Sequence, residues 1–161
     1  MCGILAASRM RRPFGHRLMS GLLKRGPDQL GFWTDGVVYI AHARLAIIGL
    51  DERSREPMEN ERHVLAYNGE VYNYGSLHQR LMGDGVAVRG VNDAEVLLHA
   101  WTHYGPSVLS DLEGFWAFVV YDKQKRTLTL VRDQFGVKPL YYYSGESVSY
   151  THLTLPTIYS V

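Results

Sequence analysis

The single cysteine of the 161-residue chain stands at position two, in the opening stretch MCGILAAS. Removal of the initiator Met1 would make Cys2 the first residue, with a free α-amino group beside its thiol. An unperturbed thiol, with a pKa of about 8.5, is mostly protonated at neutral pH, and only the thiolate is a strong nucleophile. An α-amino group titrates at about 7.7 to 8.0 and can serve as general base for its own side chain. We therefore interpret Cys2 as a catalytic nucleophile, in preference to the buried hydrophobe that a free cysteine usually is.

Attack of sulfur on an amide carbonyl produces a tetrahedral oxyanion, which needs hydrogen-bond donors close by. The stretch YNGEVYN offers two donors, the side-chain amide of Asn68 and the backbone N–H of Gly69. The alternative interpretation is a simple hairpin turn, because Asn-Gly is typical of such turns. Taken alone, this stretch supports the turn at least as well as the oxyanion site.

The hydrophobic patterning predicts strands arranged in hairpins, with a few helices between them. This order favours an α+β fold with mostly antiparallel sheets over alternating βαβ units. The expected elements are a strand at 2–7, a helix at 14–24, a hairpin around Asp35-Gly36, a strand from Arg62 that turns at Asn68-Gly69, helices at 74–82 and 94–104, a hairpin around the turn 123–126, and a strand at 138–143.

Composition narrows the class of partner. The 17 basic and 16 acidic residues leave almost no net charge that would attract nucleic acid or a membrane surface, so a small polar metabolite is the expected ligand. One cysteine cannot form an internal disulfide, and the start of the chain lacks a signal-peptide pattern, which predicts a cytoplasmic protein. The apolar runs are too short to cross a bilayer.

Seven stretches together resemble class II glutamine amidotransferase domains, and most of all the glutaminase domain of asparagine synthetases. They cover nearly all of residues 1–143 and occur in the order found in that family. The stretches are MCGIL at the start, RGPDQLGFW at 25–33, HARLAIIGL at 42–50, YNGEVYNY at 67–74, NDAEVLLHAW at 92–101, EGFWAFVVYD at 113–122 and RDQFGVKPLYYY at 132–143. The resemblance implies a four-layer α+β sandwich of the N-terminal nucleophile hydrolase type, with two antiparallel sheets flanked by helices.

The resemblance also implies a role for each matching residue. Cys2 matches the nucleophile that releases ammonia from the glutamine side chain, and Asn68 with Gly69 matches the oxyanion hole. Arg44 matches the arginine that binds the α-carboxylate of glutamine, a task suited to a bidentate guanidinium group. The remaining matches, to acidic residues that hold the α-ammonium group, are Glu70 and Asp93.

Three positions depart from the pattern usual in the family. Asn92 stands where serine or threonine commonly precedes the aspartate, Ala43 replaces a common basic residue, and Glu56 precedes Pro57 where glutamine is frequent. None of these changes removes a catalytic group. We expect them to affect the positioning of the substrate more than activity itself.

The tail of the chain is unusual in another way. The ten residues VSYTHLTLPT at 148–157 resemble the translation of a sequencing-library adapter. We therefore expect a glutaminase domain at 2–147, incomplete at its C-terminus, followed by an artefact at 148–161. A missing C-terminal synthetase domain would then carry ATP and Mg²⁺ and amidate aspartate, whereas the fragment itself is expected to need no cofactor and to allow a homodimer.

Other interpretations remain open at this point. A related amidotransferase with the same glutaminase could act on a sugar carboxylate or a peptide, and a non-catalytic domain could bind an amino acid or a protein without turnover. The fragment could also lack strands that it needs to fold. His99 and His103, four residues apart, suggest a metal, but without a zinc-protease glutamate or a third ligand we interpret them as a solvated helix face and expect no metal site.

Overall fold

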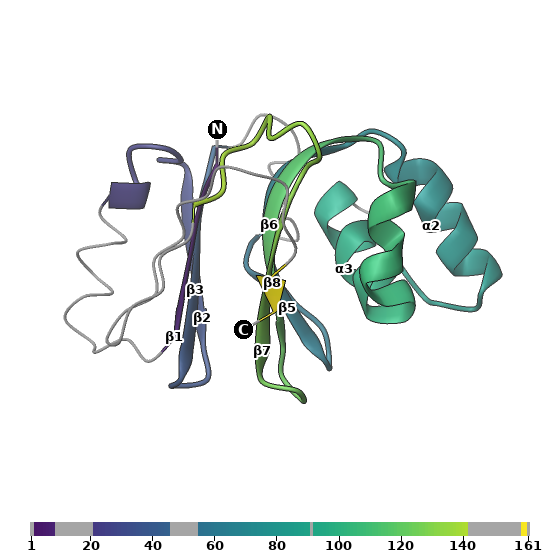
Figure 1. The fold of residues 1–161 in the computed structure, drawn as a ribbon, viewed down its shortest axis with the longest axis horizontal. Helices are drawn as coiled ribbons and strands as arrows, with labels where there is room; N and C mark the ends of the chain where they lie inside the picture. Colours follow the sequence, from purple (N-terminus) through teal and green to yellow (C-terminus); the bar gives the residue numbers. More distant parts are fainter. Residues whose placement is uncertain (1, 9–20, 46–54, 91, 142–158, 161) are drawn as a thin grey trace.

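Two antiparallel sheets stack face to face, and helices cover the outer face of the second (Figure 1). The computed structural model describes residues 2–8, 21–45, 55–90, 92–141 and 159–160. The elements are β1 (Gly3–Ser8), β2 (Gln29–Thr34), β3 (Val38–Arg44), β4 (Met58–Glu59), β5 (His63–Val71), α2 (Tyr74–Gly83), α3 (Asp93–Tyr104), the 3-10 helix η2 (Gly105–Asp111), β6 (Gly114–Asp122), β7 (Thr127–Arg132) and β8 (Tyr159–Ser160). The α+β class with two antiparallel sheets is confirmed.

The first sheet has the order β1-β3-β2, and both pairs are antiparallel. The predicted hairpin between β2 and β3 is confirmed. Its turn is held by the Asp35 carboxylate, which accepts the backbone N–H groups of Val37 and Val38 at 2.9 and 2.8 Å. Gly36 takes a φ of 88°, a region in which glycine has no steric penalty. This turn fixes the register of β3, the strand that carries His42 and Arg44.

The second sheet has the order β4-β5-β6-β7-β8, and its long central pair joins β5 to β6. The predicted turn at Asn68-Gly69 is wrong. Both residues lie inside β5, where Gly69 pairs with Trp116 of β6. A Cβ atom on Gly69 would lie only 2.3 Å from the Phe115 carbonyl oxygen, so this glycine permits a close backbone approach and makes no turn.

Two apolar clusters follow from the alternation of side chains along the strands. The layer between the sheets is filled by residues of β3 that face the second sheet and residues of β5 and β6 that face the first, namely Val38, Ile40, Val64, Ala66, Ala117, Val119 and Tyr121. The alternate residues of β5 and β6 pack under the helices, namely Leu65, Tyr67, Val71, Trp116, Phe118 and Val120. The two clusters thus assign every residue of β5 to one of two faces.

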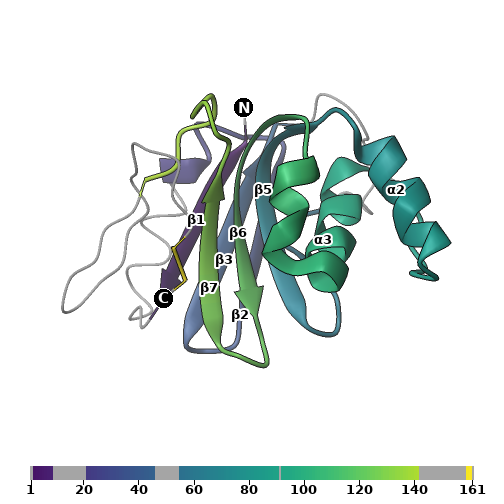
Figure 2. The same ribbon diagram turned by 45° about the vertical axis from the view of Figure 1, so that its right-hand side comes forward.

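Helices α2 and α3 lie on the side of the second sheet that faces away from the first (Figures 1 and 2). Both were predicted from the sequence, and α3 packs on the sheet as expected, with Trp101 edge-on to Phe118 at a ring-centroid distance of 5.7 Å. Asn92 caps α3, because its side chain accepts the Glu95 N–H at 2.8 Å. Every helix in the described part of the chain is too short or too polar to cross a bilayer.

The predicted strand at 138–143 is wrong for Lys138–Tyr141, which have no regular secondary structure, while 142 and 143 lie outside the described residues. The buried Asp133 carboxylate instead accepts the N–H groups of Val137 and Lys138, both at 2.9 Å. Arg132 Nε donates to the Lys138 carbonyl. These side-chain bonds satisfy backbone groups of Val137 and Lys138 in place of a neighbouring strand. The segment passes near the chain's N-terminal end in Figure 1.

Two further expectations fall largely outside the described residues. Of the helix expected at 14–24, only Gly21–Leu22 is described as helical, and the Leu22 side chain lies 3.0 Å from the Cβ position of Gly3 on the outer face of the first sheet. Residues 148–157 are not described, whereas Tyr159–Ser160 pair with β7 as β8. The domain boundary at 147 stays a prediction.

The close contact at Gly69 predicts the effect of one methyl group. Gly69→Ala should lower the free energy of unfolding by about 1 to 3 kcal/mol, because the added Cβ meets the β6 backbone, which cannot move away as a side chain could. Urea denaturation measures this change and also tests whether the chain unfolds cooperatively. The matched control is Gly75→Ala in α2, where a Cβ meets nothing within 4 Å and stability should change little. Equal effects of the two substitutions would contradict the prediction.

Candidate active site

Cys2 lies at the start of β1, partly buried, with its Sγ 4.0 Å from the Leu45 carbonyl oxygen. Ile4 and Ala6 of β1 both belong to the layer between the sheets. Because side chains alternate along a strand, Cys2 falls on the same face. Gly3 pairs with Ala43, so the same antiparallel register continued by one residue places Cys2 beside Arg44.

Asn68 and Glu70 come from β5 in the opposing sheet. They alternate with the helix-facing residues Tyr67 and Val71, so their side chains lie on the face of β5 that looks toward the first sheet. Asn68 is buried and Glu70 is exposed. Exposure to solvent therefore increases along β5 from the buried Asn68 amide to the exposed Glu70 carboxylate.

Alternate backbone groups of β5 point away from β6. In an antiparallel pair, successive residues direct their N–H and C=O groups alternately toward and away from the neighbouring strand. The N–H of Tyr67 bonds to Glu56 and the N–H of Val71 bonds to Asp93, so neither is directed at β6. Gly69 lies midway between these two residues and has the same orientation. Its N–H is therefore directed outward on what we call the outer edge of β5, the N–H groups of Tyr67, Gly69 and Val71.

Asp93 ties α3 to this outer edge. Its Oδ2 accepts the Tyr67 hydroxyl at 2.7 Å and the Val71 N–H at 3.2 Å. Its Oδ1 accepts the Ala94 N–H at 3.0 Å, in the first turn of α3, where a negative charge is favoured by the helix dipole. Burial, followed by the Asp93 charge and hydrogen bond, raises the pKa of the Tyr67 phenol, which therefore remains a hydrogen-bond donor.

A buried carboxyl group and a buried imidazole hold Tyr67 from the side. Glu56 Oε2 accepts the Tyr67 N–H at 2.6 Å, and His42 Nε2 lies 3.0 Å from the Tyr67 carbonyl oxygen. Burial lowers the pKa of His42 to about 4, and the Arg44 charge acts in the same direction. The imidazole is therefore neutral at physiological pH, and its Nε2–H donates to the Tyr67 carbonyl.

The structure brings the six predicted site residues to one end of the two sheets, where the N-terminus lies in Figure 1. Cys2 and Arg44 come from the first sheet, Asn68, Gly69 and Glu70 from β5, and Asp93 from α3. The sequence alone did not indicate that Tyr67 and His42 belong here, and it marked Glu56 only as a departure from the family's usual pattern. Their only sequence signal was their position inside or beside the recognised stretches.

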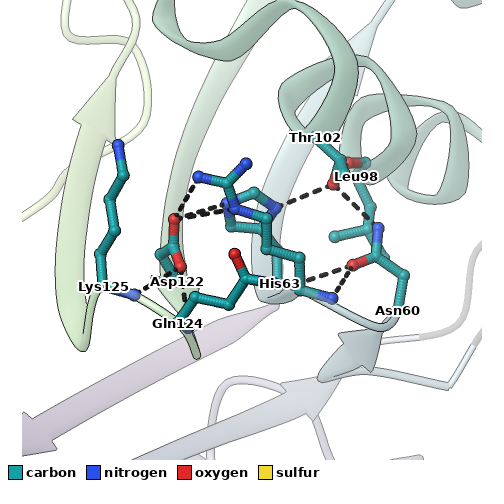
Figure 3. A network of polar contacts seen from close by, with 8 residues as sticks. Asn60, His63, Leu98, Thr102, Asp122, Gln124 and Lys125 are labelled. Atoms are coloured by element: carbon teal, nitrogen blue, oxygen red, sulfur yellow. Dashed lines mark hydrogen bonds and ion pairs between the residues drawn. The ribbon is translucent and has the colours of Figure 1, made fainter.

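A second cluster, at the far end of β5, contains a hydroxyl, an imidazole and a carboxylate but lacks the bonding of a catalytic triad (Figure 3). His63 Nδ1 lies 2.9 Å from Thr102 Oγ1, and His63 Nε2 lies 3.4 Å from Asp122 Oδ2. Thr102, however, donates its proton to the Leu98 carbonyl at 2.8 Å and accepts from Asn60. His63 therefore cannot take that proton, and the cluster joins α3 to the sheet.

The chain matches the glutamine amidotransferase domain family over residues 1–153. It belongs to this family. The matched domain is a catalytic one, so the chain is part of an enzyme, as its sequence predicted. The family match confirms the resemblance to glutamine amidotransferase domains. A solved structure, glutamine phosphoribosylpyrophosphate amidotransferase from B. subtilis, is similar to the chain in fold. It has a TM-score of 0.73 at 19% identity and covers 94% of this chain and 41% of its own, which shows a shared fold.

Similar curated proteins are glutamine-hydrolysing asparagine synthetases. Asparagine synthetase 3 of Bacillus subtilis is 35% identical over 130 residues, or 78% of this chain and 21% of its own. Asparagine synthetase B of Escherichia coli is 38% identical over 119 residues, covering 73% and 21%. A probable asparagine synthetase of Dictyostelium discoideum is 38% identical over 151 residues, covering 88% and 27%. The amidotransferase chain thus spans only about a quarter of the length of these relatives.

The neutral state of His42 predicts how stability depends on pH. A histidine in the unfolded chain has a pKa near 6.5 but His42 has one of about 4, so the folded protein binds fewer protons as the pH falls and loses stability. His42→Gln keeps a donor but cannot titrate. Between pH 6.5 and 4.5 the wild type should lose about 2 kcal/mol more unfolding free energy than this variant. Urea denaturation at both pH values measures the difference, and parallel losses would contradict the assignment.

Proposed function

We propose that the amidotransferase chain hydrolyses free glutamine to glutamate and ammonia, with Cys2 as the nucleophile. The observation that carries this proposal is the position of Cys2, directly before β1 and, by the alternation of that strand, on the face toward the second sheet, which carries Asn68. Across from it, the outer edge of β5 directs the Gly69 N–H away from β6, as deduced from its neighbours. A nucleophile and two oxyanion donors thus come from opposing sheets that the core holds rigidly.

In this mechanism the α-amino group of Cys2, free once Met1 is removed, accepts the thiol proton. The thiolate attacks the side-chain amide carbon of glutamine, and the carbonyl oxygen becomes an oxyanion held by the Asn68 amide and the Gly69 N–H. Collapse breaks the C–N bond, and the proton returns from the amine to the departing ammonia. Water then attacks the thioester through the same oxyanion site and releases glutamate, which leaves Cys2 free.

The charged groups around this centre suit the two ends of a free amino acid. Arg44 would bind the α-carboxylate as a bidentate partner, and Glu70 with Asp93 would hold the α-ammonium group. Asp93 already accepts hydrogen bonds on both oxygens, and a carboxylate has lone pairs left for an ammonium donor. A substrate with both charges should therefore be preferred over a glutamine inside a peptide.

For the whole protein we propose a cytoplasmic asparagine synthetase, in which a further domain uses ATP and Mg²⁺ to activate aspartate and accepts the ammonia. The similarity to synthetases named glutamine-hydrolysing supports this acceptor. We also propose that the whole protein forms a homodimer. A sugar carboxylate or peptide acceptor is the alternative, and asparagine formation by the full-length protein from aspartate, ATP and glutamine separates the two.

Cys2→Ala tests the glutaminase directly. Glutamate release from glutamine should fall at least about 1,000-fold, because no other group can form the thioester. Gln79→Ala, an exposed position on α2, is the matched control and should leave the rate unchanged. Wild-type activity in purified Cys2→Ala protein would refute the mechanism. A wild-type chain that binds glutamine without releasing glutamate would instead favour the non-catalytic alternative.

A further inference from the structure

The backbone of Tyr67 is held by side chains where a strand would otherwise pair with it. In the register of β4 with β5, Met58 pairs with Leu65, so the residue that would face Tyr67 is Glu56. β4 begins only at Met58, and the Glu56 side chain, rather than its backbone, accepts the Tyr67 N–H at 2.6 Å. His42 donates to the Tyr67 carbonyl oxygen from the opposite sheet. Two side chains thus take the place of the backbone hydrogen bonds that a neighbouring strand would make with Tyr67.

The environment of Glu56 favours its uncharged form. The residue is 8% exposed, and an ionised carboxylate is costly in such a site unless a charged partner neutralises it. Burial, and after it the Asp93 charge, raises the pKa of Glu56 well above the usual range, although the Tyr67 N–H and the Arg44 charge act against this shift. The 3.7 Å separation of Glu56 Oε1 from His42 Nε2 is therefore a contact between two neutral groups.

The titratable and charged groups around Glu56 come from three elements of the described chain. They are His42 and Arg44 of β3, Tyr67 of β5 and Asp93 of α3. Gly31 of β2 lies against the main chain of Glu56, so closely that a Cβ atom at position 31 would overlap the Glu56 carbonyl oxygen. Among the residues that the structure describes, only Arg44 favours ionisation of Glu56 through its charge, and Arg44 is also the proposed partner of the substrate carboxylate.

We propose that Glu56 is a positioning residue for glutamine hydrolysis, whose carboxyl group accepts the Tyr67 N–H and thereby aligns the outer edge of β5. This inference rests on the proposed glutaminase function. Glu56 and Asp93 hold the first and third N–H groups of that edge, and the Gly69 N–H lies between them. The Tyr67 hydroxyl also bonds to Asp93, so the Tyr67 main chain and the ammonium site share one support.

Ionisation of Glu56 would place a negative charge two residues along β5 from the oxyanion donor. A buried like charge disfavours formation of the tetrahedral oxyanion, so kcat should fall at alkaline pH as Glu56 loses its proton. Substrate binding is affected less directly, since neither proposed end of glutamine contacts Glu56. The expected signature is a loss in kcat with a smaller change in KM.

Glu56→Gln and Glu56→Leu separate the oxygen acceptor from the charge. At pH 7, Glu56→Gln keeps an oxygen acceptor and should retain kcat within about threefold. Glu56→Leu leaves the buried Tyr67 N–H without a hydrogen-bond acceptor and should lower kcat by about tenfold or more. As the pH is raised into the alkaline range, the wild type should lose kcat, and Glu56→Gln should not. A Gln variant as slow as the Leu variant, or an alkaline limb that is identical in Gln and wild type, would overturn the proposal.

The amide resonance of Tyr67 gives a readout that does not depend on turnover. In the wild-type chain its ¹H and ¹⁵N shifts should titrate with Glu56, and in Glu56→Gln that titration should be absent. An equal titration in both proteins would overturn the role of Glu56 even if glutamine is hydrolysed. Failure of the wild type to release glutamate would instead refute the proposed function, while the amide titration still tests the contact.

Discussion

The candidate active site depends on the outer edge of β5. In the described chain β4 pairs with only Val64 and Leu65 of β5, so the outward N–H groups of the later residues need other partners. Buried backbone donors are almost always satisfied, and here side chains from other elements take this task. Glu56 accepts from Tyr67 and Asp93 accepts from Val71, which draws the segment before β4 and the start of α3 onto one strand. The N–H of Gly69, between them, is directed away from β6 and is one of the two proposed oxyanion donors.

At this end of the two sheets, the buried titratable groups are neutral and the charged side chains lie closer to solvent. The innermost pair, His42 and Glu56, is buried and neutral, so it stabilises the strand through hydrogen bonds without burying an ion. Arg44 and Asp93 are partly exposed, and Glu70 is exposed, so a zwitterionic ligand of the proposed kind could reach all three side chains. Buried neutral groups beneath more exposed charged side chains suit the binding of a small amino acid and the stabilisation of an oxyanion next to it.

The sequence was sufficient to predict both hairpins and the helices after residues 73 and 92, because local periodicity encodes them. Ordered motifs pointed to six site residues, which the fold brings to one end of the two sheets and whose roles stay predictions. The sequence did not predict that Asn68-Gly69 continues a strand, since the Phe115 backbone that requires a glycine there is distant in sequence. Nor did it assign structural roles to Glu56 and Asp133, because each carboxyl group acts on backbone N–H groups that only the tertiary fold brings within reach.

The most direct test of the central claim is mass spectrometry of the chain after exposure to a diazoketone analogue of glutamine, an electrophile that alkylates a thiolate with loss of N₂. We expect a mature chain that lacks Met1 and carries one adduct, located on Cys2, and we expect free glutamine to slow the formation of that adduct. Retention of Met1, or an adduct whose formation glutamine does not slow, would contradict an N-terminal cysteine nucleophile in a glutamine site.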